Sequence, residues 1–130
     1  MTIPTVLCGS LLCAVLWSVA QDSTPPVIAC NIKAISEADR LRYNDLTKRL
    51  RLAIRNRSEI RDGYMFKLDG QVLSLPQVAD WISMERLCCP FLNFQLSASG
   101  NQSDWELKLT GPKGAKALLQ AEFPEVRRAE

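Results

Sequence analysis

Residues 74–96 decide the fold, and their sequence is SLPQVADWISMERLCCPFLNFQL. Ser74 and Gln77 have the spacing of a capping box, which predicts that a helix begins there. Pro90 disfavours helical geometry at the residue before it, so the helix is expected to end at the cysteine pair. Beyond the proline, apolar and polar residues alternate, which is typical of a strand with one buried face. This segment therefore predicts a helix that leads directly into a strand.

One face of this predicted helix contains both cysteines and an acidic residue. Residues spaced by three, four or seven positions lie on the same side of a helix. We therefore expect the cysteines to face the protein core. The residues on this face are Val78, Trp81, Ile82, Glu85, Cys88 and Cys89.

Helical spacing and strand alternation assign the remaining elements. Ser36 and Asp39 resemble a capping pair, and Asp62-Gly63 is expected to end the helix that follows. The last two strands flank the turn-forming sequence SGNQSD, which favours an antiparallel hairpin. Predicted helices cover residues 36–57, 74–89 and 112–123, and predicted strands cover 64–69, 92–99 and 105–110, with a further short strand left open at VIACNI, residues 27–32.

This order of elements predicts a single α+β domain. The simplest packing is a small antiparallel sheet of about three strands covered by two or three helices. A chain of 130 residues that is 47% hydrophobic and 23% charged is suited to one such domain. The expected organisation is a signal peptide at 1–20, a flexible leader at 21–28, the domain at 29–123 and a flexible tail at 124–130.

The first twenty residues, MTIPTVLCGSLLCAVLWSVA, contain no charged side chain and end in a small-x-small motif. They predict a signal peptide that is cleaved before Gln21, and hence a protein exported to a periplasm or secreted. The start of the segment has no Lys or Arg, so an uncleaved N-terminal membrane anchor is the alternative. Cleavage would remove Cys8 and Cys13 and leave three cysteines.

The three cysteines of the expected mature chain are Cys30, Cys88 and Cys89. An odd number in an exported protein requires an explanation, because thiols in an oxidising compartment tend to pair. One hypothesis is a three-thiol cluster that binds a soft metal or metalloid ion. The other is a disulfide from Cys30 to Cys88 or Cys89, with one buried free thiol.

The sequence lowers the expectation of an enzyme. It contains no histidine, which removes the usual general base and every imidazole ligand. The cysteines lie at the C-terminal end of a predicted helix, where the helix dipole favours the neutral thiol, and only Arg86 opposes that effect. Glu85 is the one carboxylate beside them, and the alternative for it is a partly exposed acid paired with a neighbouring base. We predict no catalytic residue and no cofactor other than an ion.

The segment Arg40–Arg61 contains eight basic residues and two acidic ones. Such a helix can contact an anionic surface or partner, although a solvated helix face explains the same charges. This gives the alternative function, a disulfide-braced interaction module that is not an enzyme. Nucleic acid is not expected, because no aromatic residues alternate with the basic ones.

The motif around the cysteine pair resembles that of a family of small uncharacterised bacterial proteins with the pattern E-R-x-C-C-P-F-[LF]. The resemblance extends from about Ala29 to Phe123 and includes the early cysteine. It implies kinship but no reaction. Many members of that family look cytoplasmic, whereas this chain has a predicted signal peptide. The residues that match are Cys30, Glu85, Arg86, Cys88, Cys89, Pro90 and Phe91.

The function predicted from the sequence is therefore that of a small exported thiol-cluster protein. It would bind a soft metal or metalloid ion, or sense redox state, through Cys30, Cys88 and Cys89, with Glu85 and Arg86 in support.

Overall fold

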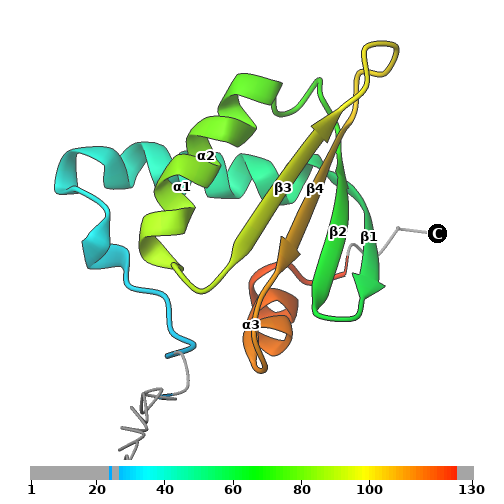
Figure 1. Cartoon of the computed structure of the whole chain (residues 1–130). Coiled ribbons are helices and arrows are strands. Elements are labelled where there is room, and N and C mark those ends of the chain that lie inside the picture. Colours follow the sequence, from blue (N-terminus) through cyan, green and yellow to red (C-terminus); the bar gives the residue numbers. More distant parts are fainter. Residues whose placement is uncertain (1–23, 25–26, 126–130) are drawn as a thin grey trace, which may run out of the picture.

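The structure is a computed structural model that describes Thr24 and residues 27–125 (Figure 1). These residues form one α+β domain, as predicted. The elements in chain order are η1 (Ile32–Ala34), α1 (Glu37–Ala53), β1 (Ile54–Ile60), β2 (Gly63–Leu68), α2 (Leu75–Cys88), β3 (Asn93–Ala98), β4 (Trp105–Thr110) and α3 (Ala115–Glu122).

The sheet is antiparallel throughout and has four strands in the order β1-β2-β4-β3, one more than the approximate number predicted. Strand β4 pairs with β2 on one side and with its hairpin partner β3 on the other. At one end of the sheet, Thr110 of β4 lies opposite both Gly63 and Asn93. A side chain at Gly63 would overlap the Leu109 carbonyl, so this close strand approach requires glycine.

The additional strand is β1, and it corrects the predicted helix at 36–57. The helix ends at Ala53, and the chain enters β1 at Ile54 without an intervening loop. Ile54 fits both the helical spacing of α1 and the alternation of a strand, so the sequence does not indicate which of the two elements contains it. In the structure this segment pairs with β2 from Ile54, opposite Leu68, to Ile60, opposite Gly63, with an irregularity between Ile54 and Asn56.

The second predicted helix is confirmed within one residue at each end. The Gln77 side chain accepts a hydrogen bond from the Ser74 amide at 3.0 Å, which satisfies a free donor at the start of α2. The helix ends at Cys88, and Cys89 is its C-cap. The predicted hairpin is confirmed as β3 and β4, and the short C-terminal helix as α3. The segment VIACNI forms no strand; it leads into η1 instead.

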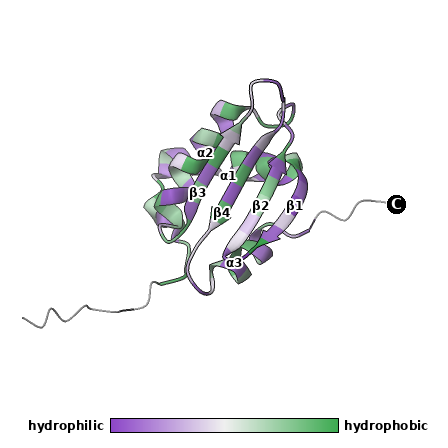
Figure 2. Ribbon diagram, turned by 45° about the vertical axis from the view of Figure 1, so that its right-hand side comes forward, coloured by the Kyte–Doolittle hydropathy of each residue, from purple (hydrophilic) through white to green (hydrophobic). Residues whose placement is uncertain are grey.

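All three helices cover the same face of the sheet. Phe66 of β2 contacts Phe123 at a ring distance of 5.4 Å, and Phe123 contacts Trp81 of α2 at 6.1 Å. The buried side of α1 contributes Leu46 and Leu50 to the same core. Figure 2 shows hydrophilic and hydrophobic residues alternating along the strands, as expected when the other face meets water.

In the described part of the chain, no helix is both long enough and apolar enough to span a membrane. The predicted signal peptide at 1–20 and most of the predicted leader and tail lie outside the described residues.

Candidate thiol site

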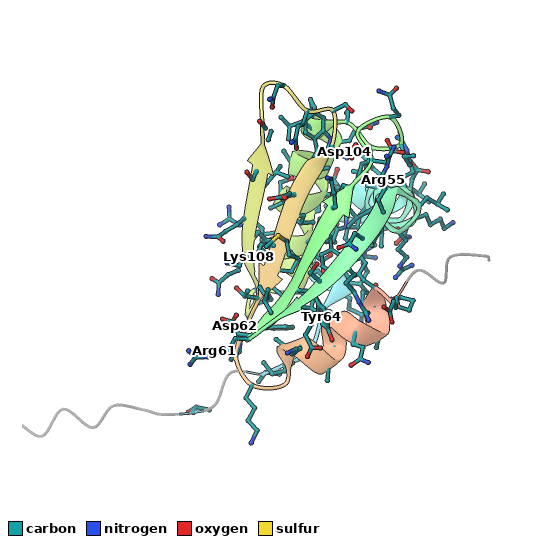
Figure 3. The ribbon with its side chains drawn as sticks, turned by 90° about the vertical axis from the view of Figure 1, so that its right-hand side faces the viewer. Arg55, Arg61, Asp62, Tyr64, Asp104 and Lys108 are labelled. Carbon is teal, nitrogen blue, oxygen red and sulfur yellow. A yellow bond between two sulfur atoms is a disulfide. The ribbon has the colours of Figure 1, made fainter. Side chains whose placement is uncertain are left out.

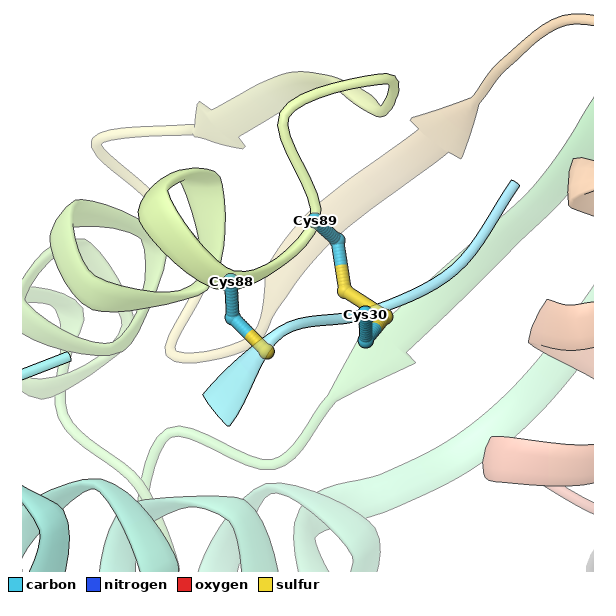
Figure 4. Close-up of side chains that lie close together, drawn as sticks. All are labelled: Cys30, Cys88 and Cys89. Atoms are coloured by element: carbon cyan, nitrogen blue, oxygen red, sulfur yellow. A yellow bond between two sulfur atoms is a disulfide. The ribbon is translucent and has the colours of Figure 1, made fainter. Parts of the chain in front are cut away.

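The three cysteines lie together where the N-terminal segment crosses the end of α2 (Figure 4). Cys30 and Cys89 form a disulfide with a Cα–Cα distance of 4.7 Å, and Cys88 is a free thiol. The three sulfur atoms lie within 4.8 Å of one another. The prediction that Cys30 meets one of the paired cysteines is confirmed, and the partner is Cys89. We call Cys30, Cys88 and Cys89 the three-sulfur site.

Backbone hydrogen bonds hold the two sides of the three-sulfur site together. The Asn31 amide donates to the Cys88 carbonyl at 2.8 Å, which fixes the N-terminal segment against the end of α2. The Cys89 amide donates to the Glu85 carbonyl at 2.7 Å and completes the last helical turn. Cys89 then leaves helical geometry, with φ −121° and ψ 70°, as expected before a proline. Of these adjacent residues only Cys89 bonds to Cys30, and the Cys88 sulfur stays within 4.8 Å of both.

The three cysteine residues differ in their exposure to solvent. Cys30 is exposed, whereas Cys88 and Cys89 are 3% and 0% exposed. A reagent from solution therefore meets Cys30 first. Exchange at a disulfide begins with attack of a thiolate on one of its sulfurs, so Cys30 is the accessible point of attack.

A buried carboxylate lies one turn before the cysteine pair. Glu85 is 4% exposed, and its Oε2 atom accepts a hydrogen bond of 2.6 Å from the Tyr43 hydroxyl of α1. Among the described residues, Glu85 forms no ion pair. The alternative prediction of a partly exposed acid paired with a base is therefore wrong.

Two further hydrogen bonds extend this buried polar contact along the interface of α1 and α2. The Thr47 hydroxyl donates to the Tyr43 carbonyl at 2.8 Å, and the Trp81 indole N–H donates to that hydroxyl at 3.1 Å. Buried polar groups that are all satisfied fix the relative position of two elements. The helix that ends at the three-sulfur site is thus held in register with α1.

Burial shifts the pKa values of the titratable groups at the site. The pKa of the Cys88 thiol is raised by burial and then by the negative charge of Glu85. Burial also raises the pKa of Glu85, although the hydrogen bond from Tyr43 opposes the shift. The pKa of Tyr43 is raised far above its ordinary value by burial and by its contact with Glu85. The site therefore disfavours additional negative charge.

Arg86, the other predicted supporting residue, is exposed and forms no hydrogen bond or ion pair with a described residue. It lines an open surface hollow of about 450 Å³, together with Ile82, Pro90, Leu92, Asn93 and Phe94. The charged groups that raise the pKa of Cys88 are Glu85 and, more weakly, Glu122. Arg86 thus differs from Glu85, its neighbour in the sequence, in both burial and surroundings.

Most basic side chains of the segment Arg40–Arg61 contact other parts of the domain. Arg49 donates to the Val72 carbonyl at 3.1 Å, and Arg57 donates to the Phe123 carbonyl at 2.7 Å. Within the described chain, the side chains of Lys48 and Arg61 form no hydrogen bond or ion pair. Contact with an anionic surface stays a prediction. The side chains engaged within the domain are those of Arg40, Arg42, Arg49, Arg51, Arg55 and Arg57.

Sequence reasoning missed two residues of the site. Tyr43 fits the helical spacing of α1, but its contact with Glu85 joins residues 42 positions apart, which no local pattern indicates. A buried tyrosine needs a partner for its hydroxyl, and this rule could have flagged it. Asn31 acts through its backbone amide, which any residue except proline supplies.

The arrangement offers three sulfur ligands, one of them accessible, beside an acid without a counter-ion. Soft metals and metalloids bind to such sulfur sets. Ordinary structural zinc sites use four ligands, and the described residues bring three together here. No protein-family model, no curated protein and no solved structure matches this chain, so the resemblance to the E-R-x-C-C-P-F-[LF] family stays a prediction.

Proposed function

We propose that this protein binds one soft metal or metalloid ion between Cys30, Cys88 and Cys89 when its disulfide is reduced. Oxidation to the Cys30–Cys89 disulfide closes the site, so uptake of the ion depends on the redox state. The observation that supports this proposal is the mutual approach of the three sulfurs to within 4.8 Å.

The size of the three-sulfur site suits a three-coordinate ion. Metal–thiolate bonds of about 2.3 Å, arranged trigonally, separate the sulfurs by about 4 Å. The three sulfurs lie within 4.8 Å of one another, and the Cys30 and Cys89 sulfurs would move apart when the disulfide opens.

The backbone around the site does not depend on the disulfide alone. The Asn31 amide bonds to the Cys88 carbonyl, and Ile35, just beyond η1, is 1% exposed in the core. These contacts keep Cys30 near its partners after reduction. A reduced site that is already assembled loses less conformational entropy when it binds an ion.

Opening of the site requires an external thiol as the reductant. Its thiolate bonds to the Cys30 sulfur, the bond to Cys89 breaks, and the Cys89 sulfur leaves with the electron pair and takes up a proton. A second thiolate then attacks the mixed disulfide, which frees the Cys30 thiol and releases an organic disulfide. Two electrons have entered the protein, and three thiols are available to the ion.

The test uses the full chain with Cys8→Ser and Cys13→Ser, so that its only thiols are those of the three-sulfur site. The protein is reduced, freed of reductant without oxygen, and titrated with cadmium ion or arsenite under native mass spectrometry. We expect one ion per chain for at least one of these probes. The oxidised form of the same protein is the matched control and should bind at least tenfold more weakly.

Substitution of Cys88 distinguishes an ion site from a structural disulfide. Cys88→Ser leaves the Cys30–Cys89 bond possible but removes one ligand, so the reduced protein should lose most of its affinity. Leu87→Ala is the matched control, because Leu87 is an exposed neighbour of Cys88. Uptake that is unchanged by Cys88→Ser would contradict the proposal, as would a reduced protein that binds neither ion.

A further inference from the structure

The three-sulfur site lies in negative surroundings. Glu85 is buried one turn before the cysteine pair and bonds to the Tyr43 hydroxyl, not to a cation. Glu122 also raises the pKa of Cys88, more weakly than Glu85 does, and Arg51 is paired with Glu122. Among the described residues, no other cation forms an ion pair at this site that could balance a negatively charged ion–thiolate complex.

The charge of the loaded site depends on the valence of the ion. Three thiolates with a divalent cation carry a net charge of −1, whereas three thiolates with a trivalent centre are neutral. Two of the three cysteines, Cys88 and Cys89, are at most 3% exposed, so the complex is largely removed from water. A net charge in such a place costs free energy unless it is paired, and Glu85 increases the cost for a negative complex.

We propose that the ion bound by the three-sulfur site is a trivalent metalloid, taken up from its neutral hydroxide such as arsenous acid. This inference rests on the proposed function and specifies its ligand. Burial of the sulfurs beside an uncompensated acid shifts the selectivity of the three thiols away from divalent cations and toward this neutral product.

The uptake reaction leaves the charge of the site unchanged. Each of the three cysteine S–H groups gives its proton to one hydroxide of the metalloid, which departs as water. Three sulfur–metalloid bonds replace three oxygen–metalloid bonds, three waters are released, and the metalloid keeps its oxidation state. A divalent cation, in contrast, leaves its three ligand protons to the solvent and a negative complex in the protein.

The test compares the reduced protein with three cysteine thiols that are exposed to water. Dissociation constants for arsenite and cadmium are measured by competition for the full chain with Cys8→Ser and Cys13→Ser, and for a short unstructured peptide with three cysteines. We expect the protein to favour arsenite over cadmium by at least tenfold more than the peptide does. A protein that favours cadmium as much as the peptide does, or more, overturns this inference while the proposed function stands.

A charge-neutral variant tests the role of the acid. Glu85→Gln keeps an acceptor for Tyr43 and removes the negative charge, so cadmium affinity should rise about tenfold while arsenite affinity changes less than threefold. Glu106→Gln makes the same charge change on an exposed residue of β4 and should alter neither affinity. Equal gains for both ions with Glu85→Gln overturn the charge argument. Failure of the reduced protein to bind either ion refutes the proposed function itself.

Discussion

Charged side chains at the two ends of the sheet have opposite environments. At the start of β4, Arg55 pairs with Asp69 at 2.7 Å and approaches Asp104 at 3.9 Å, and its side chain is 54% exposed (Figure 3). At the other end, the three-sulfur site lies beside Glu85, which is buried and forms no ion pair with a described residue.

These two environments represent two kinds of charged group: an exposed ion pair and a buried acid. An exposed ion pair such as Arg55–Asp69 gains little free energy, because water and salt screen it, and either residue can be replaced at small cost. A buried acid without a counter-ion opposes folding, and side chains in such surroundings are often found at functional sites. Glu85 is therefore the stronger indication of function, although it has fewer charged neighbours.

Loss of the disulfide should have the largest effect on stability at either end. The bond joins residues 59 positions apart, and a closed loop of this length stabilises the folded state by about 4 kcal/mol in the chain-entropy model. Cys30→Ser should therefore lower the free energy of unfolding by roughly this amount, measured by urea denaturation of the oxidised protein. Cys88→Ser is the control: it keeps the disulfide, and its buried hydroxyl should cost about 1–3 kcal/mol, less than the loss of the bond. Equal losses for the two variants would contradict the assigned pairing.

Removal of the Tyr43 hydroxyl should have the next largest effect. Tyr43→Phe leaves the buried Glu85 carboxyl without its donor, which costs about 1–3 kcal/mol of unfolding free energy. Tyr64→Phe is the matched control, because the Tyr64 hydroxyl forms no hydrogen bond within the described residues. If both variants are equally stable in urea at pH 7, the Tyr43–Glu85 bond contributes nothing to the fold.

Glu85→Gln should change how stability depends on pH. The folded state raises the pKa of Glu85, so its contribution is complete below the unfolded pKa of about 4.5 and is lost as pH rises through the folded value. Between pH 4 and pH 7, the free energy of unfolding of the variant should therefore rise relative to that of the native protein. The expected rise is about 1.4 kcal/mol for each unit by which folding raises the pKa of Glu85. Urea midpoints at the two pH values measure this gain. If the difference in stability between the two proteins is the same at both pH values, burial does not shift the pKa of the Glu85 carboxyl.

Arg55→Ala should have the smallest effect. Asp69 raises the pKa of Arg55, and Arg55 in turn lowers the pKa of Asp69, but both groups meet solvent. The expected result is a small fall in the urea midpoint that disappears in about 1 M salt, because the pair is screened there. Lys67→Ala, at an exposed residue of β2 without an ion pair in the described chain, provides the baseline. A large loss of stability that persists in salt would show that the Arg55–Asp69 pair is not a screened surface pair.

The parts of the fold with local chemical markers could be predicted. The bounds of α2 follow from the Ser74 cap and Pro90, and the β3–β4 hairpin follows from alternation around a turn. Strand β1 has no such marker: between Ile54 and Ile60 its side chains are polar or charged, as is common on an edge strand. The order of the strands is set by long-range pairing, which spacing in one sequence does not encode.

The candidate site also has one feature that the sequence predicts and others that depend on how distant segments pack. The meeting of Cys30 with the cysteine pair was predicted, but the choice of Cys89 depends on backbone geometry at the end of α2. The contact between Tyr43 and Glu85 depends on how two helices pack, and their spacing along the chain gives no indication of it.

The Cys30–Cys89 bond also divides the chain into a ring and a tail. The covalent ring contains α1, β1, β2 and α2, whereas β3, β4 and α3 belong to the tail that leaves it. Because β4 pairs with β2, the sheet is complete only when a strand of the tail docks on a strand of the ring. In the oxidised chain the ring is already closed, so folding requires one long-range docking step fewer than in the reduced chain. A protease cut at the β1–β2 turn would leave both fragments joined until a reductant is added.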